Sequence, residues 1–146
     1  MENLNQSSIK PKKIKLDFKD SKYATGRRKS SVAKVWVKKG SGNIHVNGLK
    51  MNEYFKRPVH QIIVTRPLEI SQVASNYDVK CSVKGGGLSG QAGAIILGIS
   101  KALISQDENL KKSLKKDKLT TRDSRVVERK KYGHRKARRS FQFSKR

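Results

Sequence analysis

Hydrophobic and polar residues alternate cleanly over residues 77–84, and this pattern predicts a β-strand that is buried on one face. Tyr77, Val79, Cys81 and Val83 would form the buried face, and Asp78, Lys80, Ser82 and Lys84 the other. After three glycines at 85–87, apolar residues recur at helical spacing from Leu88 to Leu103. This spacing predicts one helix ending near residues 105–107. The strand, the glycine turn and the helix are therefore the expected core.

Two further strands are predicted upstream. Residues 31–38 are rich in β-branched and apolar side chains, and residues 43–47 alternate. The glycine-containing turn at 39–42 between them predicts that they pair as a hairpin. The weaker signals are a helical turn at 51–55, a short apolar element of undecided type at 61–64, basic helical turns at 111–118, and an edge strand from Val126 through Arg129.

These elements predict an α+β domain over residues 23–128, with a small sheet packed by helices. Residues 1–22 are polar and lysine-rich, which predicts a mobile N-terminal extension. Beyond Arg129 no aliphatic residue is larger than Ala137. We therefore expect residues 129–146 to form an extended basic C-terminal tail.

The net charge of the chain indicates what kind of partner it binds. The 146 residues contain 35 Lys and Arg against 11 Asp and Glu, a formal net charge of +24. Such self-repulsion calls for a polyanion, and nucleic acid is the first candidate. A membrane surface is the second, but the basic stretches are poor in Leu, Phe and Trp, and no run approaches the ~18 apolar residues of a spanning helix.

The single cysteine, Cys81, excludes an internal disulfide or a cysteine metal cluster. The first residues lack the apolar stretch of a secretion signal, whereas residues 5–15 contain Ser and Lys and no acid, which leaves an organelle transit signal open. None of His45, His60 and His134 is spaced to bind a metal with another histidine or with the cysteine. We expect no catalytic residue, no metal and no cofactor.

The C-terminal tail is the strongest functional signal. Nine of its 18 residues are Lys or Arg, none is acidic, and Tyr132, Phe141 and Phe143 lie between them. Aromatic rings and arginines stack on unpaired bases while the charges follow phosphates. A generic basic tail without a fixed target is the alternative. The candidate RNA-binding cations of the tail and of the segment before it are Arg122, Arg125, Arg129, Lys130, Lys131, Arg135, Lys136, Arg138 and Arg139.

Arg27, Arg28 and Lys29 are three adjacent cations between Gly26 and Ser30. Arginine supplies a planar fork for phosphate oxygens and lysine a point charge. A solvated charge run is the alternative, but in so basic a chain we favour contact with phosphates.

The glycines of residues 85–90 match the G-x-G-x-x-G pattern of dinucleotide sites after a strand and before a helix. We favour a simpler explanation, in which the glycines let the chain turn and the helix approach the sheet closely. The acids Asp107 and Glu108 fall at the helix end and not at the end of a second parallel strand, where a ribose contact needs them. Backbone N–H groups at the helix start remain available to phosphates.

Three blocks of the sequence resemble the small-subunit ribosomal protein nine family of bacteria and organelles. They are YATGRRKSSVA at 23–33, GGGLSGQA at 85–92 and DSRVVERKKYG at 123–133, followed by the terminal QFSKR at 142–146. Their order and the position of the last block at the chain end make the resemblance specific. Ser140-Phe141 stands where family members often have Ala-Pro or Arg-Pro, so we expect a different bend just before the tip.

The resemblance implies an α+β domain similar to the second domain of ribosomal protein five. It implies a structural constituent of the ribosome that binds ribosomal RNA and neighbouring proteins in the head of the small subunit. It also implies that the tail reaches the peptidyl-site tRNA, with Ser144, Lys145 and Arg146 at the contact. We expect the chain on cytoplasmic ribosomes, with an organellar ribosome as the open alternative.

Two other functions compete with this interpretation. The first is a nucleotide- or NAD-dependent enzyme that uses the glycine loop at 85–90. The second is a histone-like protein that compacts DNA through its basic charge.

Overall fold

The structure is a computed structural model that describes residues 18–145. Most of the expected mobile N-terminal extension, residues 1–17, lies outside the described part of the chain, and so does Arg146.

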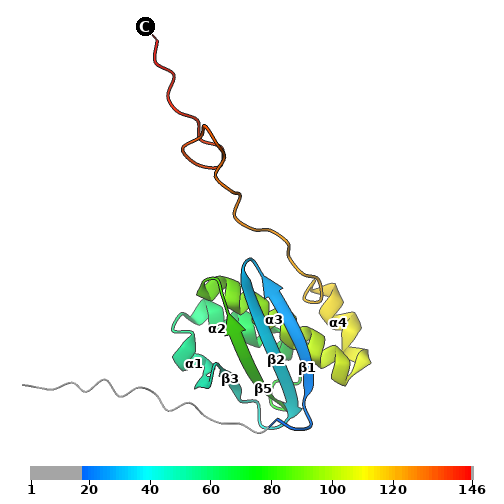
Figure 1. Cartoon of the computed structure of the whole chain (residues 1–146). Coiled ribbons are helices and arrows are strands. Elements are labelled where there is room, and N and C mark those ends of the chain that lie inside the picture. Colours follow the sequence, from blue (N-terminus) through cyan, green and yellow to red (C-terminus); the bar gives the residue numbers. More distant parts are fainter. Residues whose placement is uncertain (1–17, 146) are drawn as a thin grey trace, which may run out of the picture.

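A five-stranded sheet with the order β1-β2-β5-β3-β4 forms the centre of the domain (Figure 1). β2 pairs antiparallel with both β1 and β5, β3 pairs parallel with β5, and β4 pairs antiparallel with β3. The strands are β1 (Lys22–Arg28), β2 (Ser31–Lys39), β3 (Ile44–Val46), β4 (Leu49–Lys50) and β5 (Tyr77–Lys84).

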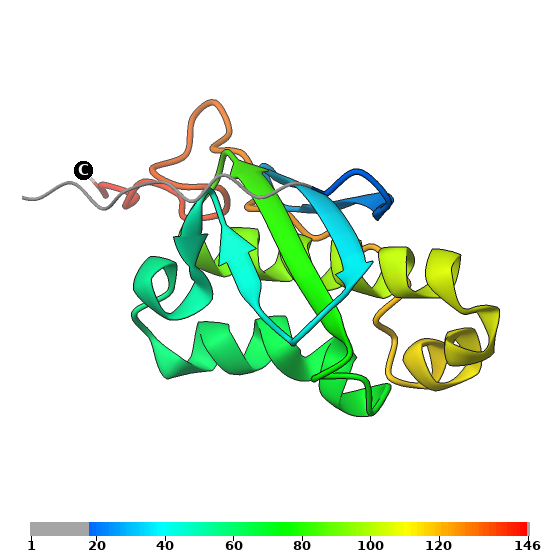
Figure 2. The same cartoon turned by 90° about the horizontal axis from the view of Figure 1, so that it is seen from below.

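The helices cover one face of this sheet. α2 and α3 lie side by side, and α4 lies at the end of α3 (Figure 2). The helical elements are α1 (Met51–Tyr54), α2 (Pro58–Ile70), α3 (Leu88–Gln106), the 3-10 turn η1 (Glu108–Leu110) and α4 (Lys111–Lys116). The predicted α+β class, the strand at 77–84 and the long helix after it are confirmed.

The hairpin predicted between residues 31–38 and 43–47 is wrong, because β5 lies between these strands. β2 and β5 are both long and share an eight-residue register from Val32–Lys84 to Lys39–Tyr77. β3 has only three residues, so it could form far fewer backbone hydrogen bonds with β2. The other neighbour of β2 is β1, whose polar sequence gave no strand signal.

The structure also decides the type of the element at residues 61–64 and tests the predicted edge strand at 126–129. The apolar residues 61–64 belong to α2, which continues through Pro67. A proline inside a helix removes a backbone hydrogen bond, but Pro67 is fully buried, and its packing offsets that loss. The edge strand predicted from Val126 through Arg129 is wrong, since these residues form no strand and Val127 is 86% exposed.

The core lies between the sheet and the helices. Each predicted apolar residue of β5 is buried, together with Ala33, Val35 and Val37 of β2. α3 is buried on more than one side because the sheet and α2 both contact it. Leu88 is the exception to the predicted apolar stripe, since the first turn of the helix leaves it 45% exposed. Length and composition alone would allow α3 to cross a membrane, and its burial in this core accounts for that apolar character.

Gly26 of β1 permits the closest approach between the sheet and α3. A Cβ at this position would lie 1.8 Å from the carbonyl oxygen of Ala94 and 2.6 Å from the backbone nitrogen of Gly98. Both obstacles are backbone atoms of a helix and cannot rotate away. The glycine of the basic motif therefore has a packing role of its own.

We predict that Gly26→Ala lowers the free energy of unfolding by about 3 kcal/mol, at the upper end of overpacking costs. The measurement is urea unfolding followed by the fluorescence of Trp36, the one tryptophan. Thr25→Ala on the exposed face of the same strand is the control and should change stability by no more than ~0.5 kcal/mol. Equal midpoints for the two variants would contradict the close packing.

Candidate nucleic-acid interface

The side chains of the three cations at 27–29 point in different directions. In the β1–β2 register Arg27 lies opposite Val32 and Arg28 opposite the buried Ser31, so successive side chains point to opposite faces of the sheet. Arg27 is exposed on the face without helices. Arg28 points to the helix side, and Lys29 forms the turn between the strands with a φ of 50°. The motif therefore presents charge on two faces and at one edge.

Asp123 joins the segment after α4 to the end of β1. Its carboxylate accepts hydrogen bonds from the backbone nitrogen of Arg125 at 2.9 Å and from the guanidinium of Arg125 at 2.8 Å. Nη1 of Arg28 lies 2.5 Å from Oδ2, the same oxygen that accepts the bond from the Arg125 guanidinium. The hydrogen bonds from Arg125, with the bond from Arg28, hold the pKa of Asp123 well below its usual value. The carboxylate is therefore ionised throughout the physiological pH range.

Two shallow hollows meet at this point, and Arg28 lines both. One has a volume of about 180 Å³ and includes Arg27 and Lys118 in its wall. The other, of about 280 Å³, is lined by Lys29 and Arg125 together with two valines, Val126 and Val127. We call this group of cations the basic root: Arg27, Arg28, Lys29, Lys118 and Arg125. It brings two sequence-predicted groups together, residues 27–29 and the segment that contains Arg125.

Beyond the basic root the chain runs away from the domain (Figure 1). Tyr132 and Phe143 are 101% and 86% exposed. Within the described range, the tail residues from 129 onward make hydrogen bonds and ion pairs only with residue 128 and with one another. The predicted cations of the tail are thus separated from the domain and face solvent.

The tail carries one local loop. The Glu128 carboxylate accepts hydrogen bonds from Lys131 and, at 2.9 Å, from Arg138. Lys131 and Arg138 together hold the pKa of Glu128 below its usual value. A β-bridge pairs His134 with Ser140, and the guanidinium of Arg135 lies 5.5 Å from the ring centroid of Phe141. The Ser140-Phe141 departure from the family pattern thus falls where this loop closes.

The glycine loop has a packing role. Gly85 and Gly86 have φ values of +76° and +61°, which favour glycine. The Ser31 hydroxyl donates a hydrogen bond to the carbonyl of Gly85 at 2.9 Å, and a Cβ on Gly86 would lie 2.2 Å from the same hydroxyl. In the described chain after α3, η1 and α4 follow where a dinucleotide site would need a parallel strand. The described chain thus lacks the second strand that a dinucleotide site needs, and close packing explains the glycines.

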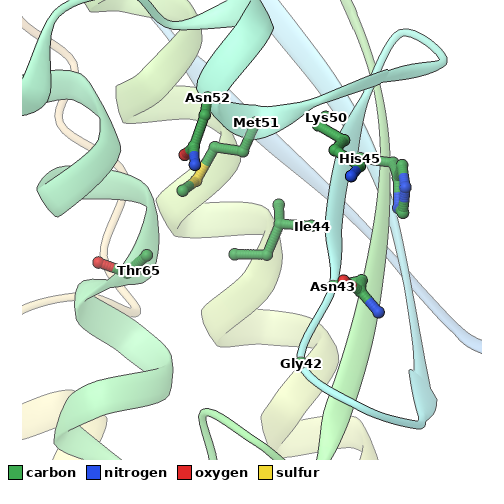
Figure 3. Close-up of a pocket in the computed structure, with 8 residues that line it drawn as sticks. All are labelled: Gly42, Asn43, Ile44, His45, Lys50, Met51, Asn52 and Thr65. Atoms are coloured by element: carbon green, nitrogen blue, oxygen red, sulfur yellow. The ribbon is translucent and has the colours of Figure 1, made fainter.

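The histidines and the sheet edge offer no metal site in the described range, where no three His, Cys, Asp or Glu residues gather. His60 is buried against the ring of Phe55, with centroids 5.8 Å apart. A hollow of about 210 Å³ lies between β3 and α2, where Ile44 points toward the helix and His45 and Lys50 lie on the other side of the strand (Figure 3). No acid or cysteine lines this hollow.

Sequence reasoning missed the face of the sheet that no helix covers. Trp36, Lys80 and Tyr23 share one row across β1, β2 and β5. We define the open sheet face as Tyr23, Thr25, Arg27, Val32, Lys34, Trp36, Lys80, Ser82 and Lys84. Lys34 and Trp36 are two residues apart in β2 and so lie on one side of it, but the neighbouring strands could not be assigned without the pairing.

The comparison with known families agrees with this geometry. Residues 26–146 match the family described as ribosomal protein S9/S16. The matched range contains Arg27 to Lys29, the glycine loop, the whole basic root and the tail. The family is a structural, non-enzymatic kind. The chain therefore belongs to the ribosomal protein S9/S16 family and is a ribosome-bound structural constituent of the small subunit that binds ribosomal RNA and neighbouring ribosomal proteins.

Proposed function

We propose that the chain binds ribosomal RNA in the head of the small subunit and extends its tail to the tRNA in the peptidyl site. The observation that carries this proposal is the contrast between a fixed root and a free tail. Asp123 and Arg28 fix the direction in which the tail leaves the domain. Beyond that point the exposed cations and aromatic rings have no partner surface on the described domain.

The division of labour follows from this contrast. The domain, residues 23–128, supplies a rigid platform, and the tail, residues 129–146, orders itself on RNA and loses conformational entropy when it does so. Fully extended at ~3.3 Å per residue, the tail reaches roughly 60 Å. The proposed ribosomal RNA contacts are Arg27, Arg28, Lys29, Arg122, Arg125, Arg129, Lys130, Lys131, Arg135, Lys136, Arg138 and Arg139.

The tip is the proposed tRNA contact. Ser144 and Lys145 are exposed, and Arg146 lies outside the described residues. A hydroxyl beside cations suits the phosphate oxygens of a tRNA backbone. On the domain, Val59 and Ile62 of α2 are 64% and 62% exposed and are candidates for contact with a neighbouring head protein.

We also propose that the chain has no enzymatic activity. The Cys81 thiol is buried in the core, and burial raises its pKa, so it is unsuited to act as a nucleophile. The glycine loop packs on β2 and is not shaped around a cofactor. Calorimetry with NAD and ATP, with the full chain, should give no heat of specific binding.

Salt dependence tests the electrostatic mechanism. With six to ten phosphate contacts, affinity for small-subunit ribosomal RNA should fall about 10³–10⁵-fold between 50 and 200 mM salt. Filter binding with the full chain measures this slope. A slope near zero would contradict binding through phosphates.

Removal of Lys145 and Arg146 tests the tip. We expect the truncated chain to enter small subunits normally and to weaken peptidyl-site tRNA binding about tenfold, because charged hydrogen bonds are lost. The matched control is Lys112→Gln with Lys115→Gln on exposed positions of α4, which removes the same charge. Unchanged tRNA affinity in subunits that contain the truncated chain would sink the tip assignment.

Asp123→Asn tests whether the ion pair with Arg28, and not only the net charge of the chain, matters for assembly. The substitution removes the ion pair with Arg28, so the root no longer fixes the exit of the tail. We expect the variant to be incorporated several-fold less well than the wild type in competitive subunit reconstitution, read by mass spectrometry. Glu53→Gln, an exposed acid on α1, is the control for charge. If net charge alone decides, both variants will match or exceed the wild type.

A further inference from the structure

We propose that the open sheet face is a second RNA-binding surface, which accepts an unpaired segment of RNA by stacking a base on Tyr23. The inference rests on the proposed RNA-binding function and extends it to residues outside the basic motif, the root and the tail. Only Arg27 is shared with the contacts already proposed. The argument stands on the arrangement of charge, the aromatic rings and one hollow on this face.

The cations of the face lie in neighbouring rows of the sheet. Lys34 is opposite Thr25 on β1 and Ser82 on β5, and the next row contains Arg27, Val32 and Lys84. Same-face positions are ~6.6–6.8 Å apart along a strand, so the cations form a compact group. Lys34, Lys84 and Arg27 are all exposed. A hollow of about 160 Å³ between Lys34 and Lys84 has Val32 and Ser82 as its other walls.

The one carboxylate on the strands already has hydrogen-bond partners within the protein. Asp78 is the one acidic residue among the five described strands. Its Oδ1 accepts hydrogen bonds from the backbone nitrogens of Ser41 at 3.0 Å and Asn43 at 2.8 Å. The carboxylate thus closes the 40–43 turn at one end of the face. No other acid lies on the described strands, so the cations at the other end are available to an external anion.

Aromatic rings adjoin these cations. The rings of Tyr23 and Trp36 lie 5.3 Å apart at an angle of 45°, and Tyr23 is 49% exposed. The ammonium of Lys80 lies 6.0 Å from the ring of Trp36 and 5.7 Å from that of Phe18. Tyr23 and Lys80 thus both lie beside the Trp36 ring, and the half-exposed Tyr23 ring is the accessible platform.

An unpaired RNA segment uses every part of this surface. A base stacks on an exposed ring, phosphates meet Lys34, Lys84 and Arg27, and the Ser82 hydroxyl offers a hydrogen bond to a 2′-hydroxyl or a phosphate. Duplex RNA keeps its bases stacked inside the helix, so no base is available to stack on the Tyr23 ring. An acidic peptide would use the cations alone.

Trp36 makes the test direct, because it is the single tryptophan and lies in the face. The full chain is titrated with a labelled, unstructured oligouridylate of ten nucleotides at low salt. Label anisotropy reports all binding, and Trp36 fluorescence reports occupancy of the face. We expect saturable quenching of Trp36, less quenching by a duplex of equal charge, and little by an oligoglutamate of equal charge.

Two variants and a matched control complete the experiment. Lys34→Glu with Lys84→Glu should abolish the quenching while anisotropy still reports binding through the tail. Lys112→Glu with Lys115→Glu on α4 makes the same charge change on exposed positions and should keep the quenching. Tyr23→Leu retains an apolar side chain beside Trp36. In the full chain it should raise the RNA concentration for half-maximal Trp36 quenching about tenfold, the loss of one stacked base.

The proposal is overturned if anisotropy shows binding without quenching, or if both double variants lose quenching equally. Oligoglutamate that quenches as well as RNA would assign the face to an acidic protein partner, which also overturns it. Each of these outcomes leaves the tail proposal intact. The absence of any anisotropy change would instead overturn RNA binding by the chain as a whole.

Discussion

Gly26 brings the backbone of β1 so near to α3 that a side chain of any size would meet the carbonyl of Ala94. This contact draws the helix against one face of the sheet. α3 and α2 then bury the apolar side chains of β2 and β5. No described helix covers the other face, and the lysines and the Tyr23–Trp36 pair lie there. The two faces have opposite chemistry because apolar and polar side chains alternate along β2 and β5, and Gly26 lets α3 pack closely on the apolar face.

The same strand end also determines how the tail begins. Arg28 follows the glycine by two residues and points to the helix side, where it meets Asp123. A single acid paired with two arginines therefore ties the segment before the tail to the domain, in a chain with a net charge of +24. Without it, the nearest cations would repel one another. Asp123 and Glu128 each pair with two neighbouring cations, whereas most bases of this region have no acidic partner among the described residues.

The sequence predicted the parts of the fold that have strong periodicity. Residues 77–84 alternate and 88–103 recur at helical spacing, so β5 and α3 could be read directly. β1 could not, because Lys22–Arg28 is polar and becomes a strand only through pairing with β2. The order of strands was also out of reach, since a turn between two strands does not show whether a third lies between them. In the site, the tail and the motif at 27–29 were visible from charge, whereas the pairing of Arg28 with Asp123, 95 residues later, required the structure.

The loop closed by Glu128 and by the His134–Ser140 bridge shortens the distance that the tail spans. While it is closed, residues 134–140 add little to the span from root to tip. If phosphates replaced Glu128 as the partners of Lys131 and Arg138, as the proposed function implies, this segment would straighten and release roughly 20 Å at ~3.3 Å per residue. The tip would then move farther from the domain while the domain stays in place. Binding of the domain and binding of the tip would therefore not need to occur at the same time.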